Sequence, residues 1–299
     1  MMGLAVYTPF GSRSEWPGDW KGQFLIREIN LKTIFIQPTF SYRIDDKMGM
    51  GIGPIFATGG FGLRKGIPVQ DTAGVYGEGN LDGGASGFGY NVGFYFRFNN
   101  KFSVGLDLRS KVKVSVASGS ANFSVPASLE EYFPSTSFST TIVLPEVVTL
   151  GFGFRPDSSW RFALDVNRVG WSTYDSLRID FAENTDKLAD ISSARMYKDS
   201  YIFRIGAERK LKKGSFIRFG VYYDMSPVQD GYLTPETPDA NKLGITSGAS
   251  IKLGNKVVLD LSFLYIEAME RTDINIETQF GGTFKSRAFV PGFGLEFKW

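Results

Sequence analysis

The amino-acid sequence predicts an all-β protein whose strands form an antiparallel transmembrane β-barrel. Apolar and polar residues alternate along most of the 299 residues, which is typical of strands with one apolar face. Several alternating segments reach about 20 residues, well beyond the usual strand of about 5–6. Short and long connections also alternate, as they do in outer-membrane barrels. Alternation alone leaves a large soluble β-sandwich open as the alternative.

Twelve strands are expected, joined by connections rich in Gly, Pro, Asp and Asn, the residues that form turns. The best candidate for a helix is a short segment at Ser128–Tyr132. The expected strands span residues 2–8, 29–44, 48–61, 87–98, 102–117, 138–155, 160–180, 199–211, 215–226, 242–253, 257–278 and 286–299. Short turns are expected at 45–47, 99–101, 157–159, 212–214 and 254–256, and long connections at 9–28, 62–86, 118–137, 181–198, 227–241 and 279–285.

The two faces of these strands are expected to meet different surroundings. Alternate residues from Phe102 to Val114 form one continuous apolar face, which is expected to contact lipid, while the polar face lines the lumen. Charges on the polar face are expected to pair as Asp107/Arg109/Lys111, Arg161/Asp165, Arg204/Glu208, Arg218/Asp224 and Glu296/Lys298. Aromatic residues at strand ends fit the membrane interfaces, namely Tyr42, Phe98, Trp160, Trp171, Tyr265 and Trp299.

Composition excludes several classes of function. The chain has no His and no Cys, so a Ser-His-Asp triad, thiol catalysis and a His or Cys metal site are impossible. Its formal net charge of +2 gives no electrostatic case for nucleic acid. No run of 18 apolar residues predicts a transmembrane helix. We therefore expect no catalytic residues, no metal, no cofactor and no nucleic-acid partner.

The end of the chain carries a more specific signal. Residues 292–299 alternate and finish on the aromatic Trp299. This segment resembles the C-terminal strand by which outer-membrane proteins are recognised by the barrel-assembly machinery. The resemblance implies that this machinery is a partner, contacted through Trp299.

Several stretches, taken in order, resemble the FadL/TodX outer-membrane transporters of long-chain fatty acids and hydrocarbons. No single motif is specific, but their order and spacing cover nearly the whole chain. The stretches are Gly3–Gly11, Leu31–Ile34, Ser41–Arg43, Leu144–Glu146, Gly151–Pro156, Asp165–Asn167, Gly170–Tyr174, Lys198–Tyr201 and Asp224–Val228.

The resemblance implies a monomeric fourteen-stranded barrel with an N-terminal plug, called the hatch. This chain aligns from the family's third strand, so we expect residues 1–299 to form a single barrel domain, a fragment that lacks the signal peptide, the hatch and the first two strands. About twelve of fourteen strands are then present. Whether the edge strands at 2–8 and 286–299 pair with each other stays open.

The resemblance also implies where ligand binds. Arg64 and Lys65 lie where a basic residue is expected to hold a carboxylate, for which Arg offers a donor fork and Lys a point charge. Thr8 aligns with a hydroxyl in the family. Ser193 departs from a second basic position, for which Arg195 could substitute. For Arg64 and Lys65 the alternative is an exposed, charged loop.

Two further features complete the expected route. Pro9, Phe10 and Gly11 interrupt the first strand, and the family opens its wall sideways at this place; an ordinary strand end is the alternative. Apolar residues in the long connections, among them Leu129, Tyr132 and Phe133, are expected to form a shallow groove that captures an alkyl chain. The alternative is that these loops only cap the barrel.

The resulting hypothesis is passive uptake of long-chain fatty acids or other hydrophobic compounds across the outer membrane. Capture would occur at extracellular loops and exit would be lateral, through the barrel wall. The alternatives are a general small-solute porin and a structural outer-membrane barrel. The expected partners are the fatty acid or hydrocarbon ligand, outer-membrane lipid and lipopolysaccharide, and the expected state is a monomer.

Overall fold

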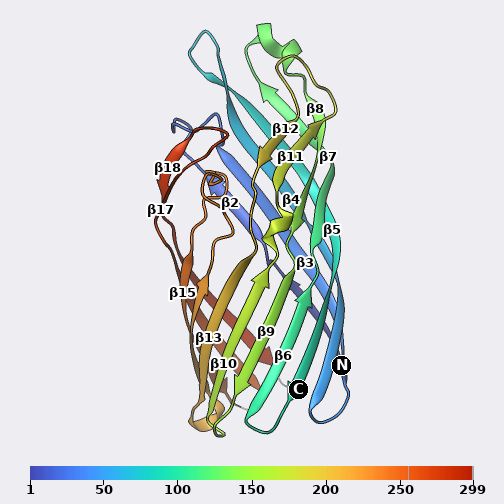
Figure 1. The fold of residues 1–299 in the computed structure, drawn as a ribbon, viewed down its shortest axis with the longest axis vertical. Coiled ribbons are helices and arrows are strands. Elements are labelled where there is room, and N and C mark those ends of the chain that lie inside the picture. The colour runs from blue at the N-terminus through green and yellow to red at the C-terminus, as the bar shows by residue number, and fades with distance from the viewer. Residues whose placement is uncertain (255, 298–299) are drawn as a thin grey trace.

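The computed structural model describes residues 1–254 and 256–297 and consists almost entirely of antiparallel strands, joined by three short 3₁₀ helices (Figure 1). No helix in these two ranges is both long enough and apolar enough to cross a membrane. The strands are β1 Met2–Tyr7, β2 Gly11–Glu15, β3 Glu28–Arg43, β4 Met48–Gln70, β5 Tyr76–Arg97, β6 Phe102–Arg109, β7 Val112–Ser124, β8 Thr136–Leu144, β9 Val147–Phe154, β10 Trp160–Val169, β11 Ser176–Phe181, β12 Ile191–Ala194, β13 Ser200–Lys210, β14 Phe216–Asp224, β15 Lys242–Leu253, β16 Val257–Ala268, β17 Arg271–Ile274, β18 Gly281–Phe284 and β19 Arg287–Phe297. The helices are η1 Ala127–Tyr132, η2 Trp171–Thr173 and η3 Lys212–Gly214.

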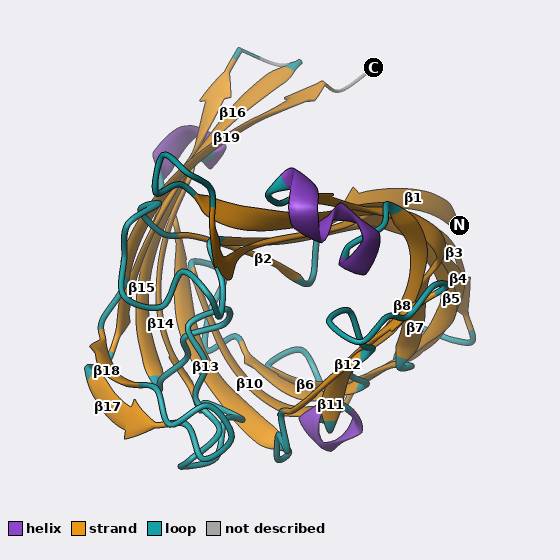
Figure 2. Ribbon diagram, turned by 90° about the horizontal axis from the view of Figure 1, so that it is seen from above, coloured by secondary structure: helices purple, strands orange, loops and turns teal. Residues whose placement is uncertain are grey.

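Each of the twelve expected strands is confirmed, although several are divided into two segments. Backbone pairing runs from β3 through β4 and β5 to β6 and β7, and continues through the β8/β9 and β10/β11 segments. It then passes through β13, β14, β15 and β16 to β19. Seen from above, these strands curl around a central space (Figure 2). The expected helix at Ser128–Tyr132 is also confirmed, as η1.

The short turns lie together at one end of the molecule (Figure 1), and three of them share a local structure. The side-chain oxygen of Asp45 accepts hydrogen bonds from the backbone N–H groups of Lys47 and Met48, at 2.6 and 2.7 Å. Asn99 and Asp157 make the same pair of bonds in their own turns. An Asx residue at the start of each of these three turns therefore satisfies the backbone where two long strands must reverse, whereas the turn at 212–214 is helix η3.

The two ends of the sheet stay apart. β1 and β2 both pair with β3, and β19 pairs with β16. Within the described residues no backbone pairing joins β1 or β2 to β19, and Figure 2 shows the β16–β19 hairpin turned away from the ring. Lys298 of the expected Glu296/Lys298 pair, Trp299 and residue 255 of the expected turn 254–256 lie outside the described residues.

Aromatic contacts nevertheless connect the two ends near the long loops. Trp16 and Trp20 stack on each other with ring centroids 4.6 Å apart. Trp20 also meets Phe280 edge-on at 5.6 Å, and Trp16 meets Phe284 at 6.1 Å. The segment after β2 therefore packs on the β17–β18 hairpin, although the strands themselves do not pair.

Three neighbouring strands break at one level, and there the apolar face changes sides. Phe102, Leu106 and Leu108 on β6 are exposed on the outer surface, whereas Val112 and Val114 on β7 are buried. β9 and β10 expose apolar residues in the same way, while β8 and β11 bury theirs. The expectation of one continuous lipid-facing stripe from Phe102 to Val114 is therefore wrong. The residues at each break do not follow the strand conformation, so the alternation of faces is shifted by one residue beyond the break. Every side chain after the break therefore points to the opposite face of the sheet.

Two expected loops are largely strand. β4 ends only at Gln70 and β5 already begins at Tyr76. Only residues 71–75 of the expected connection 62–86 therefore lie outside these strands. β7 likewise extends to Ser124, which shortens the connection expected at 118–137. Alternation persists in both places, but it was hidden by their many glycines and small polar residues.

Candidate ligand-binding site

The strand breaks divide the interior into two parts, the turn half, between the short turns and the breaks, and the loop half, between the breaks and the long loops. The lumen of the loop half is filled by buried apolar residues. Phe61 on β4 and Phe138 on β8 lie 6.1 Å apart between ring centroids, although two strands separate them in the sheet. The buried set includes Phe35, Ile55, Phe61, Leu63, Leu81, Val112, Val114, Val116, Phe138, Ile142, Leu144, Leu177, Ile179 and Phe181.

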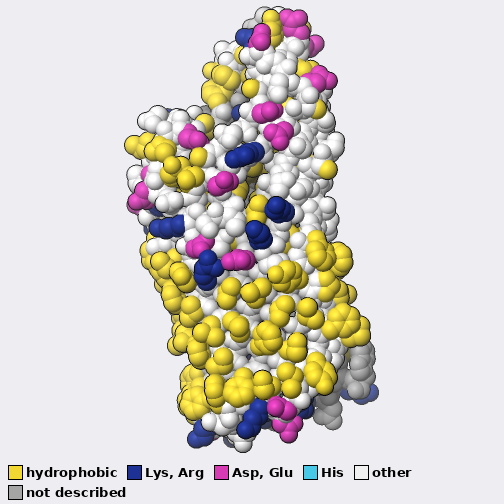
Figure 3. All heavy atoms as spheres, turned by 45° about the vertical axis from the view of Figure 1, so that its right-hand side comes forward, with side chains coloured by type: hydrophobic (Ala, Val, Ile, Leu, Met, Phe, Trp, Pro, Cys, Tyr) yellow, Lys and Arg dark blue, Asp and Glu magenta, His cyan; other side chains and the backbone are white. Residues whose placement is uncertain are grey.

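The lumen of the turn half is polar. Asn91 donates to Asp107, and Arg218 pairs with Glu208 at 2.8 Å. Arg161 also reaches Glu208, at 3.6 Å, and Arg204 donates to the amide oxygen of Asn167. The expectation of a charge-lined lumen is confirmed here, and outside this half the surface is a band of hydrophobic side chains (Figure 3).

The pairs expected within single strands are wrong in detail. Arg204 and Glu208 bond other residues, Arg161 bonds Glu208 in place of Asp165, and Asp224 meets Lys242 in place of Arg218. Asp107 bonds Asn91, while Arg109 lies over an aromatic ring. Directly opposite residues on neighbouring strands are about 5 Å apart, whereas residues i and i+2 on one strand are separated by about 7 Å, so charges pair across strands.

The first strand is interrupted where the sequence predicted. β1 ends at Tyr7 and β2 begins at Gly11, both on β3, with Pro9 in the interruption. Proline has no N–H to give to a ladder. Thr8 is exposed, whereas the hydroxyl of the preceding Tyr7 donates to Gln37 at 2.6 Å. The inward hydroxyl at this level is thus that of Tyr7.

Phe10 begins a chain of aromatic contacts at the level of the strand breaks. Its ring meets Trp171 edge-on at 5.4 Å, and the guanidinium of Arg109 lies 4.9 Å from its centroid. Trp171 continues to Tyr197 at 5.9 Å, and Tyr197 to Tyr174 at 5.2 Å. Trp171 therefore belongs to the interior, and its expected place at a membrane interface is wrong.

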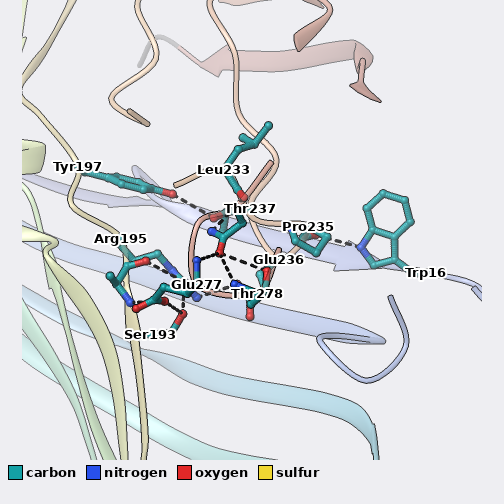
Figure 4. A network of polar contacts seen from close by, with 12 residues as sticks. Trp16, Ser193, Arg195, Tyr197, Leu233, Pro235, Glu236, Thr237, Glu277 and Thr278 are labelled. Atoms are coloured by element: carbon teal, nitrogen blue, oxygen red, sulfur yellow. Dashed lines mark hydrogen bonds and ion pairs between the residues drawn. The ribbon is translucent and has the colours of Figure 1, made fainter. Parts of the chain in front are cut away.

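Arg195 lies at the end of this aromatic chain and is the most deeply buried charge of the site, with 1% of its surface exposed. One guanidinium nitrogen donates to Glu236 at 2.7 Å and another to the hydroxyl of Ser193 at 2.7 Å (Figure 4). Glu236 comes from the connection between β14 and β15, so two distant segments meet here. The Ser193 hydroxyl thus accepts from Arg195, the residue expected to substitute for it.

Burial and charge shape the protonation of this cluster. Desolvation lowers the pKa of Arg195, but the nearby Glu236 and Tyr174 more than offset this, and its pKa is raised. Desolvation raises the pKa of Tyr197 to about 12, although a hydrogen bond with Thr237 acts in the opposite direction. Desolvation also raises the pKa of Tyr174. Near neutral pH the cluster therefore contains a charged guanidinium between two neutral phenols.

Of the two neighbouring basic residues on β4, only Lys65 joins the site. Alternate residues of β4 such as Leu63 and Ile67 are buried in the lumen, and Lys65 shares their face. Lys65 interacts electrostatically with Glu236. Arg64 projects from the opposite face and pairs with Glu28 on β3 at 3.2 Å. Arg195 thus pairs directly with Glu236, Lys65 interacts with the same carboxylate at longer range, and Arg64 lies on the other face.

The expected capture residues lie at the far end of the loop half. Phe133 packs on Phe123 with ring centroids 5.9 Å apart and contacts the buried core. Tyr132 lies under the ammonium of Lys187 at 5.4 Å, and Leu129 is half-buried in η1. This segment is therefore joined to the apolar lumen of the loop half.

Sequence reasoning did not select Glu236 or Tyr197, and it assigned Arg109 only to a charge pair in the lumen. Glu236 lies 41 residues from Arg195 and no local motif marks it. The stretch that ends in Tyr174 was noted for its order along the chain, but nothing in it indicated that its aromatic residues face inward. A single sequence shows neither the contact between Glu236 and Arg195 nor the direction in which these aromatic side chains point.

The sequence matches one family over almost its whole length. Residues 1–298 match the family described as "Outer membrane protein transport protein (OMPP1/FadL/TodX)". The chain belongs to this family. Membership places this FadL/TodX protein in the outer membrane and among non-enzymatic transport channels.

Individual relatives are distant but cover the chain. It is 20% identical to the "Long-chain fatty acid transport protein" of Escherichia coli strain K12, over 99% of this chain and 73% of that protein. Its fold is similar to a Pseudomonas aeruginosa FadL homologue, with a TM-score of 0.82, 16% identity and coverage of 99% and 73%. It is also similar to the toluene transporter TbuX of Ralstonia pickettii, with a TM-score of 0.72, 16% identity and coverage of 99% and 77%. The FadL/TodX barrel fold expected from the sequence is thereby confirmed.

Proposed function

We propose that this FadL/TodX protein takes up hydrophobic compounds with an anionic end across the outer membrane, long-chain fatty acids foremost. The observation that carries the proposal is the loop-half lumen, whose apolar residues lead to Arg195 and Lys65. An alkyl chain gains about 0.8 kcal/mol for each CH₂ group moved out of water. A buried guanidinium requires an anionic partner. The two features together match an alkyl chain that ends in a carboxylate.

Capture is proposed to begin at the long loops, which face the cell exterior in barrels of this kind. Leu129, Tyr132 and Phe133 form the outer end of the apolar lumen, since Phe133 contacts the buried core. An alkyl chain that lands there would move from one apolar surface to the next without crossing a polar barrier. Lys65 and Arg195 would then hold its carboxylate.

Exit is proposed to be lateral, beside the break between β1 and β2. Pro9 leaves a ladder position without an N–H, and Phe10 and Gly11 carry the chain past the break. Phe10 lies at this break and its ring contacts Trp171, so the edge of the sheet is in contact with the aromatic residues of the site. Thr8 is exposed next to the break, where it could meet a departing head group.

A small-solute porin is less well supported. A porin needs a continuous polar channel, and the polar lumen of the turn half ends at the strand breaks, where Phe10, Trp171 and the apolar core begin.

The experiment is uptake into vesicles whose outer leaflet is lipopolysaccharide, which slows unassisted entry of fatty acid. With the protein inserted, labelled oleate should enter clearly faster than into protein-free vesicles, while labelled glucose should not. Glucose entry at a rate comparable to oleate would instead establish the porin alternative. Absence of any oleate stimulation would contradict the proposal.

A further inference from the structure

The connection between β14 and β15, residues 225–241, folds inward and covers the charged site. Val228, Leu233, Thr234 and Ala240 in this segment are buried. Three hydrogen bonds hold it to separate parts of the wall (Figure 4). Trp16 donates to the carbonyl of Pro235 at 3.0 Å, and Asn275 donates to the carbonyl of Leu233 at 3.3 Å. The hydroxyls of Tyr197 and Thr237 share the third, at 3.0 Å. We refer to residues 225–241 as the inner loop.

Glu236, on the inner loop, supplies the carboxylate for Arg195. The guanidinium gives hydrogen bonds to Ser193, Ala194 and Glu236, but its Nε–H has no hydrogen-bond partner in the part of the chain that the structure describes. Lys65 interacts with the same Glu236 and makes no ion pair within 4 Å to any described residue. One inner-loop carboxylate therefore pairs with Arg195 and interacts at longer range with Lys65, and one buried donor of the guanidinium is left unused.

We infer that Glu236 occupies the position of a ligand carboxylate, and that an acidic ligand enters by displacing Glu236 and the inner loop from Arg195. This inference rests on the proposed function and identifies the residue that determines ligand class. Removing Glu236 without replacement would leave the guanidinium buried without a counter-charge, which is strongly unfavourable. A ligand carboxylate restores that charge, and Glu236 moves to water, where a carboxylate is well solvated. A neutral hydrocarbon cannot make this exchange.

The inference predicts that Glu236 competes with acidic ligands but not with neutral ones. In the variant Glu236→Gln the guanidinium is no longer neutralised within the chain. The affinity of purified protein for oleate should rise at least tenfold, equivalent to about 1.4 kcal/mol, while its affinity for oleyl alcohol should stay within twofold. Glu277→Gln is the matched control, because Glu277 is an exposed neighbour that accepts from the N–H of Ala194 and does not contact Arg195 directly.

The possible outcomes separate the two proposals. Oleate affinity that is unchanged or lower in folded Glu236→Gln protein would overturn the inference. An equal gain for oleate and oleyl alcohol would also overturn it, since the inner loop would then be only a steric obstacle. Wild-type protein that binds neither ligand would instead refute the proposed function.

A second measurement keeps the inference testable if Glu236→Gln does not fold. The chain has no Cys, so an Asp230→Cys variant can carry a single spin label on the inner loop, at a carboxylate that is fully exposed. Saturating oleate should increase the mobility of the label, and oleyl alcohol should not. A label whose spectrum is the same with and without bound oleate would overturn the inference.

Discussion

The two halves of the lumen are built from the same strands but have opposite character. In the turn half, β6, β9 and β10 direct Phe, Leu and Val side chains outward, and β6 and β10 line the interior with Asp107 and Arg161. In the loop half, their continuations β7, β8 and β11 direct the same kinds of side chain inward. The difference arises within a few residues, at the breaks, and teaches that one alternating pattern can serve both a lipid-facing surface and an apolar interior.

The breaks have local causes. Ser110 and Lys111 separate β6 from β7, and the Ser110 hydroxyl accepts a hydrogen bond from the backbone of Tyr90 on β5. Pro145 cannot continue the ladder between β8 and β9. Between β10 and β11 the helix η2 intervenes, and the N–H of Gly170 donates to the carbonyl of Glu146 at 2.9 Å. Because the three breaks lie side by side, they switch the face of a whole patch of sheet together.

The largest effect is expected from emptying the apolar lumen. Phe138 is 2% exposed in the loop half, so Phe138→Ala should lower the free energy of unfolding by about 3–5 kcal/mol, through lost burial and the cavity left behind. Phe94→Ala removes a ring that is 50% exposed on the outer face of the turn half and should cost clearly less. Urea unfolding of both variants in lipid vesicles measures this. Equal losses would indicate that the loop-half lumen is not a packed core.

The next effect concerns the two arginines that the sequence suggested. Arg195→Gln leaves Glu236 buried near an uncharged partner and should destabilise the protein by about 3 kcal/mol. Arg64→Gln breaks a partly exposed pair with Glu28 and should cost about 1 kcal/mol or less. The first variant should also lose oleate binding, whereas the second should keep it. If Arg64→Gln impaired binding as strongly, the assignment of the site to the inner face would be wrong.

A third effect depends on pH. The folded-state pKa of Tyr197 is raised to about 12 by burial, above about 10 in an unfolded chain. The unfolded state therefore loses its proton first, and stability present below pH 10 is lost as pH rises toward 12, by about 2–3 kcal/mol from this group. Tyr197→Phe has no phenol to titrate, so its free energy of unfolding should fall less between pH 10 and 12. The check is the unfolding midpoint between pH 9 and 12, and parallel curves for the two proteins would contradict the burial of Tyr197.

The smallest effect tests the close packing at a break. A Cβ on Gly89 would lie 2.7 Å from Val112 and 2.9 Å from Ser110, so Gly89→Val should cost about 1–3 kcal/mol. Gly84, on the same strand, has no atom within 4 Å of the corresponding position, and Gly84→Val should be nearly neutral. Thermal unfolding of the pair gives the comparison. A neutral Gly89→Val would show that β5 does not approach the break so closely.

Much of the fold could be predicted from the sequence because strands and turns are specified locally. Period-2 alternation located all twelve strands, and Asp45, Asn99 and Asp157 marked three of the turns. The face of each segment could not be predicted, because a shift of one residue inverts it and leaves the pattern unchanged. Charge pairs were misassigned for a related reason. They form between neighbouring strands, and the sequence of one strand does not show which residues of the next strand lie opposite.

The site was predicted in part. Lys65 and Arg195 were selected through resemblance, and both interact with Glu236, whereas Arg64, one residue from Lys65, faces the other way. Glu236 could not be found, because its contact depends on how the inner loop folds back over 41 residues of sequence. Phe10 was selected for a break in the strand, and its role as an interior aromatic contact emerged only from the packing.

The change of face at the breaks is tested most directly by comparing Leu106 and Val114, two residues of one alternating stripe. Single-cysteine variants Leu106→Cys and Val114→Cys can carry a nitroxide, and power saturation reports their contact with oxygen in lipid and with a nickel chelate in water. At Leu106 the label should be strongly accessible to oxygen, since this side chain is 43% exposed on the outer surface. At Val114, which is 3% exposed, it should be protected from both reagents. Ready access of either reagent to the label at Val114 would mean that the stripe does not turn inward, and would contradict the account.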